Sequence, residues 1–572
     1  MRIALAQMKV YPSDLQKNTQ NILTLIDEAK SQSADLVIFP ELAVSGLLVG
    51  DNWRDHCFVN DCLAASSLIA EAAKDITVLF GNIAGGVEIY NSCFIAQEGK
   101  LQQLSPWQGT SPVSGAYGFF SQTGIGSVYD LEISGKSYRL AVLLGKWQED
   151  LVLPDDIDLL VHMDASPLVL GEEYMFGEIK APLLHVNCCG MQNSGKTNYL
   201  FAGGSALYSA AGETLASLSL LEEGLLCCNL TGGTKATPKA ADALLFEALV
   251  YGAKEFTREV GINKAVIGLS GGIDSALAAC VYRQALGAEN ILLINMPSCY
   301  SSNTTRSLAA DLAFALGTNY AVMPVQDFLE STKELFAKTP IYCPGGESFF
   351  INVSGLTEEN VQARGRTAQI LATAAAGWGA IFTCNGNKAE CSVGYATFYG
   401  DLAGAFAITA DLWKHQVYQA AAYAGTLIPT AAEALAKISQ IKPSAELSAQ
   451  QAVEEGKGDP LVYPYHDYLL ASWVEKDATP YDILLWYSQG VLAQRIGCAA
   501  QLIPQLFPTV AAMIADIEYW WRMYRGMGVA KRIQAPPLLA LSARPFGDPK
   551  GENRAGSYFG RQYEALKHQL LG

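Results

Sequence analysis

The chain has 572 residues, which is long enough for two or more domains, each with a hydrophobic core of its own. Hydrophobic residues make up 50% of it and charged residues 17%, a composition that is typical of globular proteins and argues against a disordered chain. The net charge of −17 and the lack of a basic stripe argue against a nucleic-acid surface, and no apolar run reaches the ~20 residues that a membrane span needs. We therefore expect no nucleic-acid partner and no membrane partner.

The cysteines and the first residues indicate a cellular compartment. The 13 cysteines are an odd number and show neither CxxC pairs nor the spacing of a metal site. Cys188-Cys189 and Cys227-Cys228 lie in apolar runs, as buried thiols do. Residues 1–14 predict a short strand and a polar turn and lack the architecture of a signal peptide. We expect a reduced, cytoplasmic protein.

Residues 1 to about 230 alternate short β-rich runs with helical patterns, which predicts an α/β architecture. Helices are expected at 18–32 and 60–74. The strand candidates are 2–8, 35–40, 76–83, 91–97, 138–144, 158–163, 182–189 and 204–209.

Two motifs in this half resemble a known family. Residues 35–46 are DLVIFPELAVSG, and residues 185–213 contain HVNCCG followed by YLFAGGSALYSAAGE. In this order they resemble the nitrilase, or carbon–nitrogen hydrolase, family over about 1–230. The resemblance implies a nitrilase-like α/β sandwich, with Glu41 at the position of the general base.

The other two residues that such an amidase needs are missing. A thiolate nucleophile should follow the apolar strand near position 145, but Gly145 stands there. The lysine that stabilises the oxyanion should lie in the segment QLSPWQGTSP (103–112), which holds Trp107 and no lysine. No cysteine lies between Cys93 and Cys188, so a shifted alignment does not supply the nucleophile. We predict a degenerate amidase site at Glu41, Trp107 and Gly145, with a structural role for Glu41.

A second pattern in this half imitates a nucleotide site. Residues 190–197, GMQNSGKT, match the P-loop pattern GxxxxGK[ST] letter for letter. A P-loop must open a helix so that its lysine and hydroxyl converge on phosphate, and the residues that follow do not predict one. We expect no nucleotide at this segment.

A change of composition after about residue 230 indicates a linker. Thr231-Gly232-Gly233-Thr234 leads to Pro238, with lysine and alanine between. We predict a nitrilase-like domain at 1–230, a linker at 231–242 and a second domain at 243–572.

The second domain opens with a motif suited to phosphate. The apolar strand 265–269 leads into Ser270-Gly271-Gly272-Ile273-Asp274-Ser275, and an alanine- and leucine-rich helix follows. Glycines let the backbone approach an anion, and a helix N-terminus adds positive potential. Asp274 would repel phosphate unless the two share a Mg²⁺ ion. The pattern resembles the pyrophosphate-binding loop of the N-type ATP pyrophosphatases, and the strands at 291–298 and 320–325 predict a doubly wound parallel sheet.

Further motifs follow in a fixed order. They are ENVQARGR (359–366), TCNGNKAECSVGYATFYGD (383–401), TADLWKHQVY (409–418), PSAEL (443–447), KGDPLVYPYHDYL (457–469) and KRIQAPP (531–537). Together with the loop at 270–275 they resemble the NAD⁺ synthetase family over residues 240–550. The nitrilase-like domain in front is the arrangement of the family's glutamine-dependent class. The family adenylates the nicotinate carboxylate of nicotinic acid adenine dinucleotide with ATP, and ammonia then displaces AMP to give NAD⁺.

The resemblance assigns roles residue by residue. Asp274 and Glu390 match the ligands of Mg²⁺, and Asp274, Lys414 and Lys531 match catalytic positions. ATP and pyrophosphate would be bound by Ser270, Gly271, Gly272, Ile273, Asp274, Ser275, Arg364, Asn385 and Lys414. The dinucleotide would be bound by Tyr395, Asp401, Glu446, Lys531 and Arg532.

Several of these residues have simpler interpretations. Glu390 could be an acid on a helix face, Asp401 a turn residue and Glu446 a solvated acid. Lys531 and Arg532 could form a charged pair on the surface, and the helix carrying Arg364 could make only local ion pairs.

The leading hypothesis is an ATP- and Mg²⁺-dependent NAD⁺ synthetase without its own glutaminase site. It would use free ammonia or ammonia from a separate glutaminase, and the resemblance implies at least a homodimer. One alternative is glutamine hydrolysis through an unrecognised nucleophile. Another is a different ligase with the same loop, such as a GMP or asparagine synthetase, which the YGD and KRIQAPP segments disfavour. A regulatory pseudoenzyme that binds nucleotides is the third.

Overall fold

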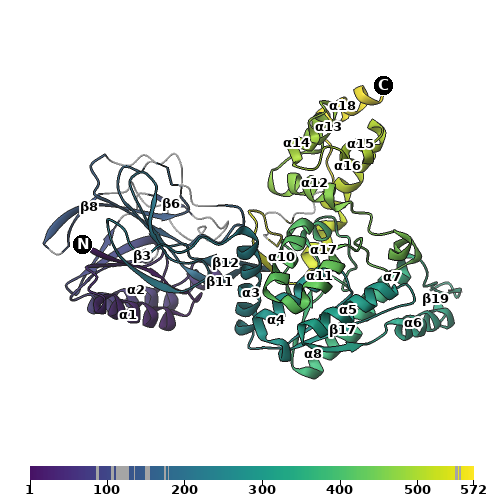
Figure 1. Cartoon of the computed structure of the whole chain (residues 1–572), viewed down its shortest axis with the longest axis horizontal. Coiled ribbons are helices and arrows are strands. Elements are labelled where there is room, and N and C mark those ends of the chain that lie inside the picture. The colour runs from purple at the N-terminus through teal and green to yellow at the C-terminus, as the bar shows by residue number, and fades with distance from the viewer. Residues whose placement is uncertain are drawn as a thin grey trace. The chain divides into compact units, whose positions relative to one another are not determined.

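The computed structural model describes residues 1–85, 89–104, 108–110 (backbone only), 128–133, 135–147, 155–172, 176–177, 179–547, 552 and 556–572 (Figure 1). The chain divides into two compact units. Unit 1 is Met1–Ser194 with Asn198–Ala240, and unit 2 is Gly195–Thr197 with Ala241–Gly572. The predicted linker at 231–242 stays a prediction. Among the described residues, no helix is long and apolar enough to cross a membrane.

Unit 1 contains two sheets. The first has the order β15-β1-β2-β3-β4-β5, and the second has the order β14-β13-β10-β9-β8-β6, with β7 paired to β8. The strands of the first sheet are β1 (Arg2–Gln7), β2 (Leu36–Ile38), β3 (Thr77–Gly85), β4 (Ile89–Gln97), β5 (Lys100–Leu104) and β15 (Gly224–Asn229). Those of the second are β6 (Gln108–Thr110), β7 (Tyr129–Ile133), β8 (Lys136–Gly145), β9 (Leu159–Asp164), β10 (Leu183–Asn187), β13 (Ala206–Tyr208) and β14 (Thr214–Ser217).

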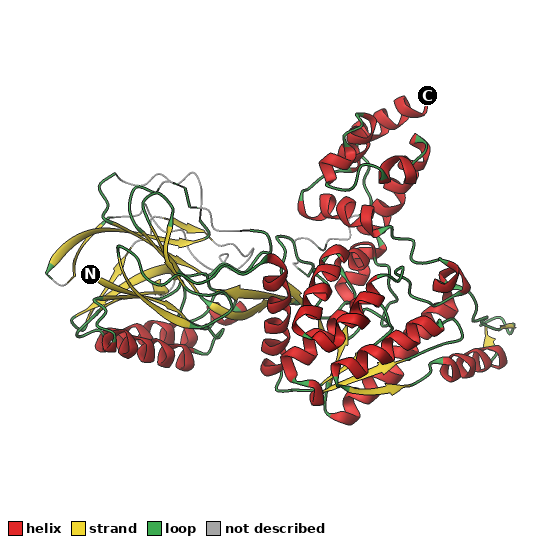
Figure 2. Ribbon diagram, viewed as in Figure 1, coloured by secondary structure: helices red, strands yellow, loops and turns green. Residues whose placement is uncertain are grey.

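The alternation of side chains along the strands explains how these sheets pack. Ile3 and Leu5 of β1 point to one face and join a core shared with Val142 of β8 and Val161 of β9, so the two sheets lie face to face. Ala4 and Ala6 point to the other face, against the helices α1 (Leu15–Ser31) and α2 (His56–Ala72). These helices lie along the strands in Figure 2. The predicted α/β sandwich is confirmed.

The helix boundaries of unit 1 follow from capping. Asp14 accepts a hydrogen bond from the amide of Lys17 and starts α1, and Asp55 accepts one from the amide of Cys57 and starts α2. Both helices begin three or four residues before the predicted starts at 18 and 60. β11 (Cys189–Ser194) and β12 (Thr197–Ala202) are further strands, so the predicted strand 182–189 is two strands joined at Cys188.

The parallel sheet of unit 2 has the order β23-β22-β21-β16-β17-β18. Its first strand in sequence, β16, lies in the middle, and later strands add on both sides, which is a doubly wound topology. Helices lie on both sides of the strands (Figure 2), so the predicted fold class is confirmed here as well. The strands are β16 (Ala265–Gly268), β17 (Ile291–Asn295), β18 (Asn319–Val322), β21 (Ile381–Cys384), β22 (Phe406–Ala407) and β23 (Leu538–Ala540).

The helices around this sheet form two sets. Those between the strands are α3 (Ala241–Glu259), α4 (Ile273–Leu286), α5 (Asn303–Leu316), α6 (Gln326–Lys338), α7 (Leu356–Arg364), α8 (Ala372–Trp378), α9 (Lys388–Val393), α10 (Lys414–Leu427) and α11 (Ala432–Ser439). A π-helical stretch, Gly365–Leu371, joins α7 to α8. A short hairpin of β19 (Ile341–Tyr342) and β20 (Ser348–Phe349) follows α6.

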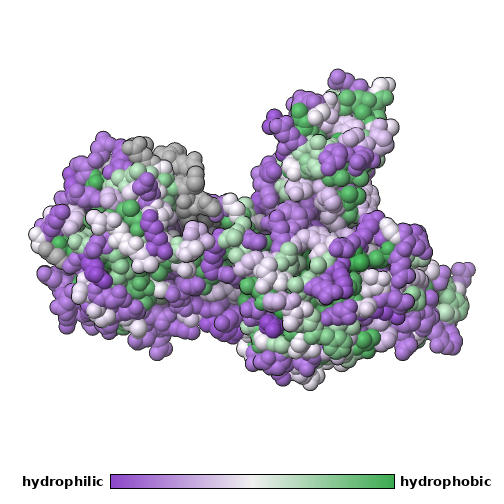
Figure 3. Space-filling view, viewed as in Figure 1, coloured by the Kyte–Doolittle hydropathy of each residue, from purple (hydrophilic) through white to green (hydrophobic). Residues whose placement is uncertain are grey.

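The second set packs around an aromatic core that includes Tyr465, Trp473 and Trp520. Its members are α12 (Tyr463–Glu475), α13 (Pro480–Ser488), α14 (Leu492–Ile496), α15 (Leu502–Leu506), α16 (Val510–Arg525) and α18 (Arg561–Leu571). The remaining helix, α17 (Met527–Gln534), follows α16 in the sequence. Hydrophilic residues cover most of the face of unit 1 that Figure 3 shows.

Phe406 of β22 should be a main contributor to the stability of this sheet. Its side chain is fully buried and its ring stacks on that of Phe256, with the centroids 4.2 Å apart. Phe406→Ala should lower the free energy of opening of the β21–β22 region by about 3–5 kcal/mol, because it leaves a cavity. Phe349→Ala, at a half-exposed position, should change it by less than about 0.5 kcal/mol. Hydrogen exchange followed by mass spectrometry checks both, and equal protection in the two variants would contradict the prediction.

Candidate active site

Hydrogen bonds among its own residues fix the conformation of the loop between β16 and α4. Ser275 Oγ accepts from the amide of Ser270, and Ser270 Oγ accepts from the amide of Gly272, both at 3.2 Å. α4 begins at Ile273, directly after the glycines. The loop therefore ends at the N-terminus of a 14-residue helix, which is an anion-binding geometry.

A cavity of about 280 Å³ lies at this end of the sheet. The loops after β16 and β21 both contribute to it, as expected at the switch point of a doubly wound sheet. The predicted site residues that line it are Ser270, Gly272, Ile273, Asp274, Ser275, Asn385, Glu390, Tyr395, Asp401, Lys414 and Glu446. Those that do not line it are Gly271, Arg364, Lys531 and Arg532.

Three charged side chains form the centre of this cavity. Lys414 Nζ donates to Asp274 Oδ2 and lies 4.0 Å from Glu390 Oε1, and its side chain is only 3% exposed. Asn387 Nδ2 donates to Asp274 Oδ1 at 3.1 Å, and the hydroxyl of Tyr463 donates to Glu390 Oε1 at 3.1 Å. Each side chain of the triad is thus fixed by a second contact or by burial.

Burial and mutual repulsion set the protonation of the triad. Burial raises the pKa of Glu390 to about 8, and the neighbouring Asp274 carboxylate adds to the rise while Lys414 opposes it. Burial alone would lower the pKa of Lys414, but the carboxylates of Asp274 and Glu390 raise it above its ordinary value. A cation is therefore retained between the two acids. Two carboxylates that face one cavity supply the oxygen ligands that Mg²⁺ prefers, so the residues present fit this ion.

Glu446, which could have been a solvated acid, is buried and caps the helix α5. Glu446 is 7% exposed, and its carboxylate accepts from the amide of Ser302 at 3.1 Å and from the hydroxyl of Thr305 at 2.7 Å. It covers the N-terminus of α5. Arg366, which the sequence analysis did not single out, lines the cavity near it. Burial lowers the pKa of Arg366 to about 10, and the charges of Asp401 and Glu446 oppose this.

Asp401 lines the cavity, whereas Arg364 does not. The carboxylate of Asp401 accepts a hydrogen bond from the amide of Thr397 at 2.6 Å and so closes the turn formed by residues 397–401. Both interpretations of this residue, turn and ligand contact, are thus compatible with its place. Arg364 is exposed and donates to the carbonyl of Phe398 at 3.1 Å, outside the cavity wall.

The two basic residues of α17 do not form a surface pair. Lys531 Nζ donates to the carbonyls of Gly394 and Ala396, and Arg532 is 5% exposed and donates to Glu552 at 3.0 Å. Burial lowers the pKa of Lys531 while Asp401 opposes the change. Lys531 thus fixes the segment after α9, whereas Arg532 also donates to the carbonyl of Ser392 within α9, and neither residue lines the cavity.

Of the residues predicted to form a degenerate amidase site in unit 1, Glu41 is buried and Gly145 ends a strand. Glu41 is 1% exposed and accepts from Asn91 Nδ2 at 2.5 Å; burial raises its pKa, and Asp164 adds to the rise. Gly145 ends β8 with a φ of +79°, and its carbonyl oxygen lies 2.6 Å from His162 Nε2. Trp107 lies outside the described residues.

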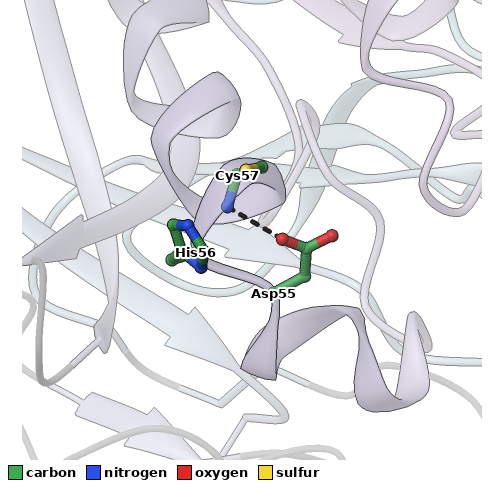
Figure 4. Close-up of side chains that lie close together, drawn as sticks. All are labelled: Asp55, His56 and Cys57. Atoms are coloured by element: carbon green, nitrogen blue, oxygen red, sulfur yellow. Dashed lines mark hydrogen bonds between the residues drawn. The ribbon is translucent and has the colours of Figure 1, made fainter.

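Two groups of side chains in unit 1 have the composition of metal sites. His162, Asp164 and His185 are fully buried, and the Nδ1 atoms of the two histidines lie 3.0 Å apart. Since His162 Nε2 faces the carbonyl of Gly145, a hydrogen bond from His185 to His162 accounts for this approach without an ion. The other group is Asp55-His56-Cys57 (Figure 4), three consecutive exposed residues at the start of α2, where Asp55 serves as the helix cap.

The segment that matches the P-loop pattern does not have a P-loop structure. Residues 189–202 form the strands β11 and β12 with a turn between them, and no helix follows. Lys196 Nζ donates to the carbonyls of Arg532 and Ile533. Its amine is therefore held by backbone of α17, in agreement with the expectation from the sequence.

Comparisons with known proteins cover both halves of the chain. Residues 245–496 match the family described as NAD synthase, and residues 2–100 match the family described as carbon–nitrogen hydrolase. A glutamine-dependent NAD(+) synthetase of Synechocystis sp. is 30% identical over 84% of this chain and 90% of its own. One of Xylella fastidiosa is 28% identical over 98% of this chain and 99% of its own.

Two solved structures are similar over the whole length. A glutamine-dependent NAD(+) synthetase of Cytophaga hutchinsonii matches with a TM-score of 0.76 at 17% identity, covering 100% of this chain and 99% of its own. The enzyme of this name from Acinetobacter baumannii, in complex with ADP, matches with a TM-score of 0.65 at 23% identity, covering 98% of this chain and 99% of its own. At these identities the similarity shows the fold.

The two glycines of the loop should differ sharply in their tolerance of a side chain. Gly271 has a φ of +89°, and a Cβ atom there would lie 2.2 Å from the carbonyl oxygen of Thr305, so Gly271→Ala should lower the free energy of unfolding by about 2 kcal/mol or more. Gly272 has an ordinary φ, and its Cβ would meet only Ser270 Oγ at 3.3 Å, so Gly272→Ala should cost less than about 1 kcal/mol. Urea unfolding checks the difference, and equal losses would contradict it.

Proposed function

The chain belongs to the NAD synthase family, whose members are ligases that form a C–N bond, and we propose that it makes NAD⁺ with ammonia as the nitrogen source. In this proposal the cavity of unit 2 binds ATP and nicotinic acid adenine dinucleotide. The observation that carries it is the contrast between the two units. Asp274, Glu390 and Lys414 converge in one cavity beside the glycine loop, whereas Gly145 stands at the nucleophile position of unit 1.

In the first step of the proposed reaction, the cavity must stabilise the negative charge of the ATP phosphates. A carboxylate is a poor electrophile, so the nicotinate carboxylate must attack the α-phosphate of ATP to form an acyl adenylate, with pyrophosphate as the leaving group. The amides and hydroxyls of Ser270, Gly272 and Ser275 lie at the N-terminus of α4, where they can bind the departing pyrophosphate. Mg²⁺ bound at Asp274 and Glu390 would neutralise the charge that builds up on the phosphates.

In this proposal Lys414 has one role in the free protein and another when the nucleotide is bound. In the free protein its ammonium group pairs with the Asp274 carboxylate and lies 4.0 Å from Glu390 Oε1, so the charge of Asp274 is compensated within the cavity. With nucleotide bound, the phosphate oxygens offer this ammonium group new partners within the same cavity. Lys414 would then hold the leaving pyrophosphate while Asp274 and Glu390 are left for the metal ion.

The nitrogen source follows from the chemistry that unit 1 can no longer supply. Glycine has no atom that can attack an amide, and residues 101–135 contain no lysine for the oxyanion. We propose that free ammonia, or ammonia delivered by a separate glutaminase, enters the second step and displaces AMP. Unit 1 then has a scaffold role.

Glutamine remains the alternative donor, because the relatives named above are glutamine-dependent. Cys188, whose pKa responds to the charges of Glu41 and Asp164, is the thiol best placed to act as an unrecognised nucleophile. Burial raises its pKa, and the neighbouring Cys189 and the two acids raise it further. Since catalytic cysteines need a lowered pKa, this environment disfavours the alternative.

Three properties complete the proposal on the strength of the resemblance. The protein would require Mg²⁺, would form at least a homodimer and would work in the cytoplasm. Size-exclusion chromatography with light scattering tests the second of these.

The nitrogen source can be tested directly. With nicotinic acid adenine dinucleotide, ATP and Mg²⁺, we expect NAD⁺ formation with ammonium and none with ammonia-free glutamine. Asp274→Ala should lower this turnover by at least about 1,000-fold, because the phosphates lose their metal ligand. Glu41→Gln should leave turnover with ammonium unchanged. Comparable turnover with glutamine that Glu41→Gln abolishes would contradict the degenerate amidase site.

Metal binding should be linked to pH through Glu390. Below a pH of about 8 its carboxyl group holds a proton in the metal-free cavity, and a metal ion must displace this proton. The apparent affinity for Mg²⁺ should therefore rise by up to about tenfold per pH unit until pH is about 8 and then level off. Calorimetry with a non-cleavable α,β-methylene analogue of ATP, in buffers of different ionisation enthalpy, measures the proton released.

Glu390→Gln is the matched control for this experiment, because its amide keeps the shape of the side chain and cannot titrate. It should bind Mg²⁺ more weakly and without proton release. A pH dependence that persists in this variant would show that another group titrates.

A further inference from the structure

The wall behind the cavity contains a lysine that is completely buried. Lys388 is the first residue of α9, and its side chain has no exposed surface. It does not line the cavity. In the sequence it lies between Asn387, which donates to Asp274, and Glu390, which lies near Lys414. A buried ammonium group is strongly unfavourable unless acceptors surround it, so its partners have to be fixed in place.

The ammonium group of Lys388 has three acceptors. They are Asp411 Oδ1 at 2.8 Å, Glu475 Oε1 at 2.7 Å and Ser542 Oγ at 2.6 Å. Nζ donates hydrogen bonds to Glu475 and Ser542 and forms an ion pair with Asp411, so its charge is compensated at the buried position. The rings of Trp413 and Phe546 lie 5.2 and 5.8 Å from Nζ and shield it from water. We call Lys388, Asp411, Glu475 and Ser542 the rear cluster.

On one side the rear cluster fixes the start of α9. The amide of Lys388 donates to the carbonyl of Leu412 at 2.8 Å, so backbone and side chain are both anchored. Asn387 and Glu390 cap each other across this first turn, at 3.1 and 3.3 Å. Since α9 has only six residues, its own helix propensity cannot hold this position. A shift of Lys388 would therefore move Asn387 and Glu390 relative to Asp274.

On the other side the rear cluster fixes the start of α10. Asp411 Oδ2 accepts from the amides of Leu541 and Ser542, at 2.7 and 2.8 Å, and so ties the segment before α10 to the strand end of β23. Trp413 Nε1 donates to the same oxygen of Glu475 that Lys388 contacts, at 2.9 Å. Trp413 is the residue directly before Lys414 and caps α10 through Gln416.

We propose that Lys388 is a positioning residue for the adenylation step. Through the rear cluster it sets the position of Glu390 and of Lys414 around Asp274, and it thereby holds the carboxylates at the spacing that a Mg²⁺ ion and the ATP phosphates require. It touches neither substrate nor metal. This inference rests on the proposed roles of Glu390 and Lys414.

The test measures how NAD⁺ formation depends on the Mg²⁺ concentration, using the full chain. Lys388→Met keeps the length of the side chain and removes its charge. We expect kcat to fall and the half-saturating Mg²⁺ concentration to rise, each by about 10- to 100-fold, as for residues that orient metal ligands. KM for the dinucleotide should change by less than about threefold, because the ligand-facing side chains are unaltered. A simple loss of folded protein would lower the total rate without moving the half-saturating concentration.

Two further variants keep the result interpretable. Lys437→Met removes an exposed lysine of α11 whose partner is Glu433, and it should leave both parameters unchanged. Glu475→Gln weakens the rear cluster at its partly exposed member, which is 24% exposed, without leaving a buried carboxylate unpaired. If Lys388→Met does not fold, Glu475→Gln should still raise the half-saturating Mg²⁺ concentration by about 3- to 10-fold.

A folded Lys388→Met protein with an unaltered Mg²⁺ dependence would overturn the inference, as would an unaltered dependence in Glu475→Gln. Failure of the proposed nitrogen source looks different. An enzyme that uses glutamine and not ammonium would contradict that proposal, and the Mg²⁺ titration would then be run with glutamine as the donor.

Discussion

The structure of unit 2 depends on one electrostatic constraint, which is that the carboxyl groups of Asp274 and Glu390 face the same cavity. Lys414 meets this constraint by placing its buried ammonium group against Asp274 and near Glu390. The three residues come from the starts of α4, α9 and α10, which follow β16, β21 and β22. Because those strands are parallel neighbours, their carboxyl ends lie at one edge of the sheet. The doubly wound topology thus delivers the triad to one place.

The parts of the site that could be predicted are those whose roles follow from residues close to them in the sequence. The loop at 270–275 combines a strand, glycines and a helix start within a few residues, and Glu390 lies in a long motif directly after a strand. Lys388 and Glu446 could not be interpreted in this way. The partners of Lys388 are at positions 411, 475 and 542, and those of Glu446 are at 302 and 305. A lone lysine or glutamate in a sequence does not reveal such distant partners. For Glu446 the resemblance predicted a dinucleotide contact and the simpler interpretation was a solvated acid, and neither predicted that it caps α5.

Most of the fold of unit 1 could be predicted because its core is built from apolar side chains and does not depend on the predicted amidase residues. The sandwich is held by alternating side chains such as Ile3, Leu5 and Val142, and their pattern is visible in the sequence. The helix starts were missed by a few residues because Asp14 and Asp55 act as caps ahead of the apolar pattern. At Gly145 the backbone has a left-handed φ, a conformation in which a side chain is strained and glycine is not. Glycine at this position is therefore free of the backbone strain that a side chain would introduce.

The pKa shifts around Glu41 in unit 1 differ from that of Lys414 in unit 2, and this contrast bears on the proposed nitrogen source. In unit 1 burial raises the pKa values of Glu41 and Cys188 and lowers that of His185, so all three are driven to their neutral forms. In unit 2 the carboxylates raise the pKa of Lys414 and keep it charged despite its burial. A thiolate is an anion and needs a nearby positive charge to persist in a buried site. The lysine that would have supplied this charge in unit 1 is missing together with the nucleophile. If the amidase site is degenerate as we propose, its electrostatics differ as well as its nucleophile, and we expect a thiol brought to position 145 to stay protonated.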